Sequence, residues 1–93
     1  MRDYEITIII DPNEDTVKQT KERVKEYINS YKGNITEEND PGIRTLGYEI
    51  KDKKQGYYHQ ITVNLDPSKV SELEREFKLD ENILKYFTMV LNK

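Results

Sequence analysis

Histidine and cysteine, the side chains that most often carry catalysis or bind metals, are almost missing from this sequence. The 93 residues include one histidine, His59, and no cysteine. Catalytic triads and multi-histidine metal sites need more than one histidine, and thiolate sites and disulfides need cysteine. We therefore interpret His59 as a structural residue of a strand. No nucleophile, base and orienting group come together in the sequence, so we expect neither an enzyme nor a cofactor, metal or small-molecule substrate.

Acidic residues occur in short runs that are better explained as helix caps and solvated charges than as cation sites. Asp11, Glu14 and Asp15 lack the ligand spacing of a calcium loop. They lie where a helix is expected to begin, and there Asp11 or Asp15 can accept hydrogen bonds from free backbone N–H groups. The pairs Glu37–Glu38 and Asp80–Glu81 are interpreted as solvated charges.

Basic residues are the best candidates for a binding chemistry, because Lys and Arg side chains supply most contacts to phosphate groups. Arg44 and Lys85 interrupt apolar strands, so solvation alone explains them poorly. Lys53 and Lys54 lie in a polar connection, where solvated charge is the default explanation. The 15 Lys+Arg against 18 Asp+Glu give a net charge of −3, which excludes a broadly basic surface but allows a local basic patch.

The seven tyrosines allow two interpretations. Tyr27 and Tyr31 fall on the apolar stripe of an expected helix, which indicates core residues. A tyrosine on a strand can stack on a base or lie at a protein interface, and it can equally cover a sheet with no ligand. Both possibilities stay open for the tyrosines of the expected strands, which are Tyr48, Tyr57, Tyr58 and Tyr86.

The elements that position these residues can be predicted from hydrophobic periodicity. Alternating apolar and polar residues predict a first strand over residues 3–10. Apolar residues at helical spacing then predict a helix that ends at about Lys32, with Gly33 in the left-handed position beyond its end. Residues 1–93 are enough for one domain and too few for two. The charged N-terminus contains no signal peptide or membrane span, so we expect a cytoplasmic protein that does not contact a membrane.

The middle of the chain is predicted to be two strands. An extended segment covers about 34–50, and Asp40-Pro41-Gly42 is expected to bend or bulge it, because proline cannot donate to a sheet ladder. A polar connection of hairpin type is predicted over 51–56. A third strand over 57–65 places Tyr57, His59, Ile61, Val63 and Leu65 on one face and Tyr58, Gln60, Thr62 and Asn64 on the other.

The second half of the chain repeats the order of the first. Asp66-Pro67 predicts the start of a second helix over about 67–78, and a fourth strand is predicted over roughly 82–91. The junction Ile10-Asp11-Pro12 recurs as Leu65-Asp66-Pro67, each time between a strand and a helix. We therefore predict a ferredoxin-like α+β sandwich of order β-α-β-β-α-β, with a four-stranded antiparallel sheet and both helices on one face. The other face of such a sheet is open to a partner or to nucleic acid.

Four segments of the chain together match one family pattern. They are Met1-Arg2-x-Tyr4-Glu5, Gly42-x-Arg44-x-Leu46-Gly47-Tyr48-x-Ile50, Gly56-Tyr57 after a lysine-rich turn, and Asn82-Ile83-Leu84-Lys85. Their order and spacing resemble the bacterial small-subunit ribosomal protein S6 family across essentially the whole chain. The second segment is the most specific of the four.

The resemblance implies a ferredoxin-like structural protein of the small ribosomal subunit. It implies binding to the central domain of small-subunit ribosomal RNA together with ribosomal protein S18, as a heterodimer. The RNA-binding residues implied by position are Arg2, Arg44 and Lys85, with Lys53 and Lys54 as weaker candidates. Tyr48, Leu46 and Tyr58 are implied at the partner-protein interface. The acidic balance suits this arrangement, because a basic partner can neutralise many of the phosphates.

Three positions depart from the family pattern. Gly47 stands where the family usually has alanine, which loosens the strand by roughly 0.5–1 kcal/mol. Thr45 and Lys85 stand where arginine is common. Because lysine cannot form a bidentate fork, a specific base or phosphate contact at position 85 is carried over less securely.

Two other functions fit the same predicted fold. A small-molecule regulatory domain, dimeric through its sheet, would need a ligand pocket, and no glycine-rich loop joins the first strand to the first helix. An enzyme of the acylphosphatase type would need an arginine in a phosphate-binding loop at that junction. The loop there, 11–15, is acidic and disfavours an anion.

Overall fold

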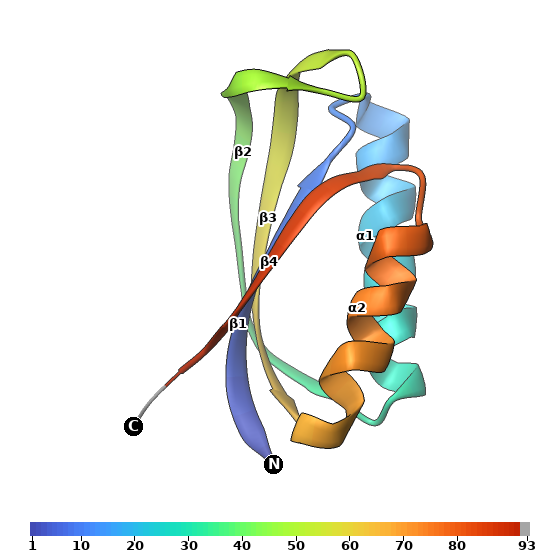
Figure 1. Ribbon diagram of the computed structural model, residues 1–93, viewed down its shortest axis with the longest axis vertical. Helices are drawn as coiled ribbons and strands as arrows, with labels where there is room; N and C mark the ends of the chain where they lie inside the picture. The colour runs from blue at the N-terminus through green and yellow to red at the C-terminus, as the bar shows by residue number, and fades with distance from the viewer. Residues whose placement is uncertain (92–93) are drawn as a thin grey trace.

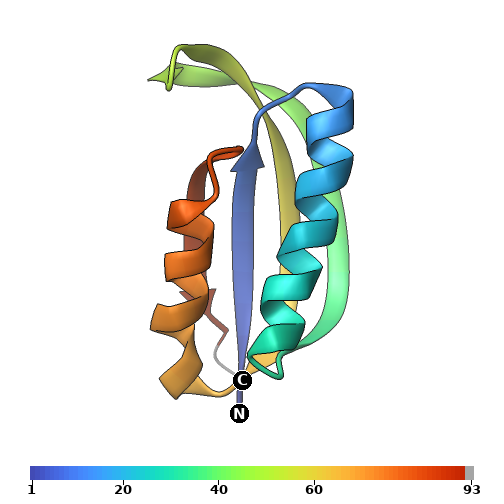
Figure 2. The same ribbon diagram turned by 90° about the vertical axis from the view of Figure 1, so that its right-hand side faces the viewer.

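Four strands form one antiparallel sheet in a computed structural model that describes residues 1–91. The elements in chain order are β1 (Arg2–Ile10), α1 (Glu14–Ser30), β2 (Asn34–Ile50), β3 (Lys53–Leu65), a 3-10 helix η1 (Pro67–Lys69), α2 (Val70–Leu79) and β4 (Ile83–Val90). The strand order in the sheet is β2-β3-β1-β4. Both helices cover the same face (Figure 1, Figure 2). This arrangement confirms the predicted ferredoxin-like sandwich.

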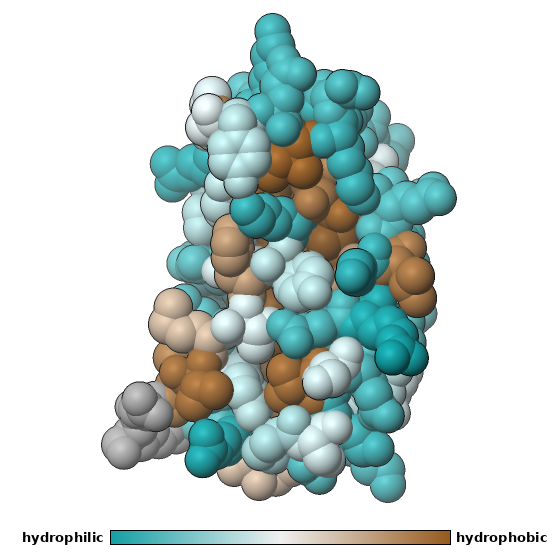
Figure 3. Space-filling view, in the orientation of Figure 1, coloured by the Kyte–Doolittle hydropathy of each residue, from teal (hydrophilic) through white to brown (hydrophobic). Residues whose placement is uncertain are grey.

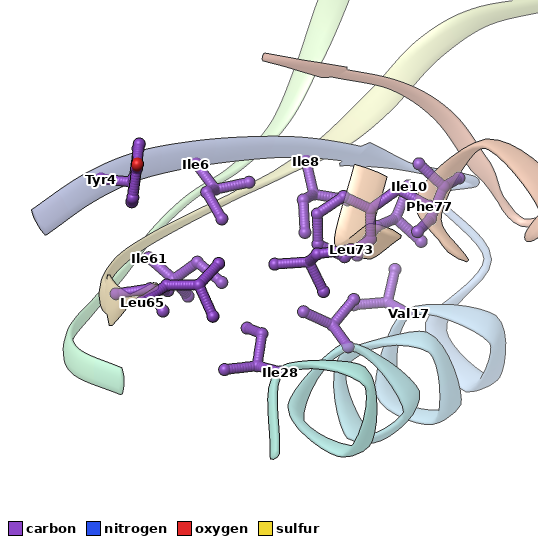
Figure 4. Packing of buried hydrophobic residues seen from close by; sticks show 13 residues of the cluster. Tyr4, Ile6, Ile8, Ile10, Val17, Ile28, Ile61, Leu65, Leu73 and Phe77 are labelled. Atoms are coloured by element: carbon purple, nitrogen blue, oxygen red, sulfur yellow. The ribbon is translucent and has the colours of Figure 1, made fainter. Parts of the chain in front are cut away.

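The core lies between the sheet and the two helices. Even-numbered residues of β1, from Tyr4 to Ile10, point toward the helices, and each is at most 4% exposed. Their partners on β3 share this face, since Ile6 lies opposite Ile61. From the helices, Ile28 of α1 and Phe77 of α2 complete the cluster, which Figure 4 shows. The period of two in β1 therefore decides which side chains enter the core.

The start of α1 differs from the prediction in the identity of its cap. The side chain of Asn13 accepts hydrogen bonds from the backbone N–H of Asp15 and Thr16, at 3.1 and 3.2 Å. Asp11, one of the expected caps, instead accepts from the N–H of Asn13 at 3.1 Å. Asn13 has an extended backbone directly before the first helical residue, Glu14, and only this position brings a side-chain oxygen to the free N–H groups of the first turn.

The end of α1 also differs from the prediction. The left-handed residue is Lys32, with φ 61°, and not Gly33. Gly33 donates to the carbonyl of Ile28 at 2.9 Å and Lys32 donates to Asn29 at 3.0 Å, the pattern of a Schellman motif. Gly33 is suited to its position for a different reason, because a Cβ there would lie 2.8 Å from Cγ2 of Ile28.

We expect Lys32→Gly to raise the free energy of unfolding by about 0.5–1 kcal/mol. A residue with a Cβ is strained in the left-handed conformation, and the relief exceeds the entropy that glycine adds to the unfolded chain. Lys32→Ala is the matched control, since it removes the charge but keeps the Cβ. Urea unfolding of the two variants measures the difference, and equal stabilisation by alanine would show that the backbone conformation is not the cause.

The connection between β2 and β3 is shorter than predicted. It consists of Lys51 and Asp52 alone, both with positive φ, and β3 begins at Lys53. The prediction of a polar connection over 51–56 is therefore wrong for 53–56. The two strands continue past the end of β1 and pair only with each other there, so polar residues can face solvent on both sides. Figure 2 shows this hairpin passing above the end of β1 toward the side of β4.

The other predicted boundaries agree with the structure. The ladder between β2 and β3 shifts register between Asn39 and Gly42, where a bulge was expected, and Gly42 has φ 89°. Asp66 caps the second helical segment by accepting from the N–H of Ser68 at 2.9 Å. That segment starts as the 3-10 helix η1 before it becomes α2. Within residues 1–91, no helix combines the length and the apolar character needed to cross a membrane.

Candidate nucleic-acid interface on the open sheet face

One face of the sheet carries no helix, and we call it the open face. It is formed by the odd-numbered residues of β1 and by the residues that lie opposite them, because paired residues of neighbouring strands point to the same side. Ile9 lies opposite Tyr58 on β3 and Lys85 on β4. Thr7 lies opposite Gln60 and Phe87. The predicted residues Tyr58 and Lys85 therefore share this face.

A lysine and two aromatic rings meet at one end of the open face. Nζ of Lys85 donates to the hydroxyl of Tyr48 at 2.7 Å. The same ammonium lies 5.4 Å from the centroid of the Tyr48 ring and 5.2 Å from that of Phe87. Tyr48 comes from the hairpin and Lys85 from the opposite edge of the sheet, so the bend of the hairpin brings them together. The quadrupole of the Phe87 ring favours the cation. The contact with Tyr48 is the hydrogen bond to its hydroxyl, which lies at the edge of the ring.

The floor beside these residues is apolar and tightly packed. Ile9 is only 2% exposed although it lies on the face without helices. A Cβ on Gly56 would be 2.4 Å from Cγ2 of Ile9 and 3.5 Å from Cδ2 of Leu46. Leu46, predicted at a partner interface, therefore folds over Gly56 as part of this floor. The hairpin rests on β1 here because glycine leaves the space.

The predicted basic residues divide into two groups. Arg44 lies opposite Gly56 and shares the open face with Lys85. Lys54, two residues before Gly56, shares that face by alternation, and both Arg44 and Lys54 are exposed. Lys53 points to the other side, where its Nζ lies 3.4 Å from a carboxylate oxygen of Asp11. The structure thus brings Arg44, Lys54 and Lys85 to one end of the open face.

Arg2 lies far from the other predicted RNA-binding residues. It is exposed and lies opposite Leu65, at the other end of β1 from Ile9. Seven steps along a strand span roughly 23 Å at about 3.3 Å per residue. Alternation also turns Arg2 to the helix side of the sheet. Arg2 therefore does not belong to the cluster that contains Lys85, although one extended ligand could touch both.

The end of the open face away from Lys85 is acidic. Glu5 lies opposite Thr62 on β3 and Met89 on β4, and Glu37 of β2 lies opposite Thr62 as well. Asp3 lies two residues before Glu5 on the same face, where it accepts from the side chain of Asn64 at 2.9 Å. The open face is therefore divided along β1 into a basic, aromatic end and an acidic end. The net charge of −3 conceals this division.

The carboxylate of Asp40 holds strand β2 in place on the helix side of the sheet, a role that was not predicted from the sequence. Asp40 accepts from Nζ of Lys21, from the hydroxyl of Tyr57 at 2.8 Å, and meets Nδ1 of His59 at 2.5 Å. His59 is 1% exposed, which agrees with a structural role. Partial burial acts to raise the pKa of Asp40, but the hydrogen bonds from Lys21, His59 and Tyr57 outweigh it and lower the pKa to about 2. These contacts fasten edge strand β2 to α1.

Asp40 is expected to make stability depend on pH in acid. Its folded pKa of about 2 lies below the unfolded value, so the stabilisation is complete above about pH 4 and is lost as the pH falls toward 2. The loss should be about 2 kcal/mol. Chemical denaturation of the wild type and Asp40→Asn between pH 5 and 2 measures it. Parallel pH profiles for the two proteins would contradict the assignment to Asp40.

A second carboxylate, Asp80, was expected to be solvated, and this expectation is wrong. Its side chain is 4% exposed. Arg23 donates to both of its oxygens, at 2.9 and 3.1 Å, and the hydroxyl of Tyr27 donates at 2.8 Å. Burial acts to raise the pKa of Asp80, and the bonds from Arg23, Tyr27 and the N–H of Asn82 more than offset it, so the pKa is lowered. Asp80 joins α1 to the segment that leads into β4.

The described residues hold no cluster of three or more His, Asp and Glu side chains arranged to bind a metal ion. The loop between β1 and α1, where a phosphate-binding enzyme would need an arginine, is engaged in other contacts. Asp11 pairs with Lys53, and Asn13 caps the helix. The candidate site is therefore the basic and aromatic end of the open face. Its cations can pair with phosphate groups, and its aromatic side chains can stack on planar rings.

Comparison with known proteins identifies a family. The family model of ribosomal protein S6 matches residues 3–90. The small ribosomal subunit protein bS6 of Helicobacter acinonychis is 37% identical, over 96% of this chain and 64% of its own length. The corresponding protein of Flavobacterium psychrophilum is 30% identical, over 100% of this chain and 84% of its own. The chain thus spans a little under two thirds of the Helicobacter relative.

A solved structure agrees with the sequence comparison. The crystal structure of 30S ribosomal protein S6 from Thermotoga maritima superposes with a TM-score of 0.88 and is 33% identical, covering 97% of this chain and 87% of that one. The fold, the family model and the relatives all lead to the same group of proteins. The chain belongs to the ribosomal protein S6 family.

Proposed function

We propose that residues 1–93 act as one domain that binds small-subunit ribosomal RNA together with ribosomal protein S18. Members of the S6 family are structural proteins of the small ribosomal subunit, a component of the bacterial cytoplasm, and not enzymes. The observation that carries the proposal is the cluster of Arg44, Lys54 and Lys85 beside exposed aromatic rings on a sheet face without helices. Cations and rings on such a face suit phosphates and bases.

The division of charge on the open face supports a shared complex. Three basic residues are few for a protein that binds RNA alone, and Glu5 and Glu37 at the far end would repel phosphates. A basic partner protein seated near the acidic end would remove this repulsion and add its own phosphate contacts. Apolar and aromatic surface at the basic end comes from Leu46, Tyr48 and Tyr58. The partner protein would extend along the open face to this surface and meet the RNA there.

A binding titration tests the proposal. Central-domain ribosomal RNA is titrated with the protein at several salt concentrations, with and without S18. We expect weak binding alone, tighter binding with S18, and a log–log salt slope for this protein's contacts of about −2 to −4, at 0.7–0.9 per phosphate contact. Absence of any gain from S18 at every salt concentration would reject the proposal.

Single variants assign the contacts. Arg44→Gln should weaken RNA binding and make the salt slope shallower by about 0.7–0.9. Lys18→Gln is the matched control, because Lys18 is an exposed cation on α1, on the helix side of the sheet. Arg2→Gln reports whether the RNA also reaches the distant end of β1. An equal effect of Lys18→Gln and Arg44→Gln would show that binding follows net charge and not the open face.

A further inference from the structure

Phe87 and Tyr48 are unusual among the aromatic residues of this protein because their rings lie in solvent. Phe87 is 50% exposed and Tyr48 is 64% exposed, whereas Phe77 is 1% exposed in the core. Phenylalanine has no polar group that gains from contact with water, and burial of such a ring is worth about 1.5–3 kcal/mol. Phe87 is not isolated, since Met89 on the same face of β4 is also exposed, and a patch of exposed apolar side chains on an open sheet face indicates a surface that binds a partner or ligand.

The two rings are held in place before any ligand arrives. Phe87 lies in the middle of β4, opposite Thr7 of β1, so its backbone is fixed by the sheet. Tyr48 is held by the hydrogen bond that its hydroxyl accepts from Lys85 at 2.7 Å. Nζ of Lys85 lies 5.2 Å from the centroid of the Phe87 ring and 5.4 Å from that of the Tyr48 ring. A site ordered in advance loses less entropy on binding.

We propose that Phe87, Tyr48 and Lys85 form a stacking site for one unpaired nucleotide of the RNA, with the base lying on the Phe87 ring and Lys85 pairing with the adjacent phosphate. Tyr48 closes the site from the hairpin side. This inference rests on the proposed function, and it adds that recognition includes a base and not only backbone phosphates. Sequence-tolerant stacking on sheet aromatics is a common way to bind single-stranded RNA.

The surroundings favour a nucleotide over an apolar protein segment. The cations Arg44, Lys54 and Lys85 gather at this end of the face, and an apolar segment would have to leave their charges unpaired or carry carboxylates of its own. Apolar surface continues from Phe87 to Met89, which is 61% exposed and lies opposite Glu5 near the acidic end. Figure 3 shows hydrophobic surface over this end of β4. That part suits the protein partner, and Phe87 lies at the boundary.

Affinity and its salt dependence together separate stacking from phosphate contact. Binding of the protein with S18 to central-domain RNA is measured at several salt concentrations. We expect Phe87→Ala to weaken binding roughly 5- to 150-fold, the effect of losing one stacked base, with the salt slope unchanged. Phe87→Tyr should retain most of the affinity. Lys85→Gln should instead make the slope shallower by about 0.7–0.9.

Leu79→Ala is the control for the loss of exposed apolar surface, since Leu79 is 72% exposed at the end of α2, which covers the other face of the sheet. We expect it to bind RNA within about twofold of the wild type, because Leu79 lies outside the surfaces proposed for the RNA and for S18. Titration of S18 without RNA is the second measurement, and Phe87→Ala should leave that affinity unchanged. Thermal unfolding confirms that each variant is folded.

Three outcomes would overturn the inference. The first is that Phe87→Ala binds RNA as tightly as the wild type. The second is that it loses the same factor in affinity for S18 without RNA, which would make Phe87 a protein contact. The third is an equal loss for Leu79→Ala. In each case the wild type still binds RNA with S18, so the proposed function stands; a wild type that does not bind would reject the proposed function itself.

Discussion

Replacing Asp80 by alanine is expected to lower the free energy of unfolding by about 3 kcal/mol, a large part of the 5–15 kcal/mol typical of a domain. The change removes the partner that Arg23 holds through two hydrogen bonds and that Tyr27 holds through a third. Because the Arg23 side chain is 33% exposed, water can hydrate its guanidinium group in the variant. The expected loss of stability therefore lies at the lower end of the range for breaking a buried ion pair. Urea unfolding at pH 7 measures it.

Glu81→Ala provides the control for Asp80→Ala. Glu81 is the next residue in the same segment and is exposed, so its loss should change the free energy of unfolding by less than about 0.5 kcal/mol. If the two variants were equally stable, the contacts of Asp80 would contribute nothing net. A difference of about 3 kcal/mol would show that the charge is needed to fix α1 against the start of β4.

A methyl group at position 56 is expected to cost about 3 kcal/mol, near the upper end of the range for overpacked sites. In Gly56→Ala the new Cβ would lie 2.4 Å from Cγ2 of Ile9. That methyl belongs to a β-branched side chain with little freedom, and Ile9 is 2% exposed, so the strands themselves must separate. Because the hairpin carries Tyr48 to Lys85, the same variant should weaken RNA binding.

Gly47→Ala is the matched test on the same hairpin. A Cβ at position 47 meets no atom within 4 Å, and Gly47 is absent from the positions with positive φ. Alanine should stabilise the protein by about 0.5–1 kcal/mol, because glycine loses more entropy on folding. Thermal unfolding of both variants compares them. Destabilisation by Gly47→Ala, or none by Gly56→Ala, would contradict the packing described for the hairpin.

The sequence alone was sufficient for the order and type of the elements, because these depend on neighbours along the chain. The alternation of Tyr4, Ile6 and Ile8 predicts both the first strand and its buried face, and the structure confirms it. The repeated Asp-Pro junction predicted the starts of the helices to within a few residues. The detailed caps were less predictable, since Asn13, Asp11 and Asp15 are all good capping residues and only backbone geometry selects among them.

The burial of charges could not be predicted in this way. Asp80 and Glu81 are adjacent acidic residues with the same local pattern, yet one is buried and the other exposed. The difference comes from Arg23, whose guanidinium reaches Asp80 from a position 57 residues away. Asp40 is a similar case, since its partners Lys21 and His59 lie on other elements. No periodicity within a segment reports on such pairs.

The candidate site shows the same division. Residue type alone identified Arg44, Lys85 and the strand tyrosines as candidates for ligand binding. Lys85 was singled out because it interrupts an apolar strand. Phe87 was missed, because alternation within β4 does not say which face lacks helices. Only the tertiary structure brought Tyr48 and Phe87 close to Lys85 and separated Arg2 from them.

The sequence by itself therefore determined a small ferredoxin-like domain with a family resemblance and no catalytic residues, because hydrophobic periodicity and residue type are local properties. The tertiary structure decided where its binding chemistry lies. The bend of the hairpin over Ile9, made possible by Gly56, places an aromatic ring beside a cation from the opposite edge of the sheet. That contact depends on distances between segments far apart in the chain, which follow from packing and not from the order of residues.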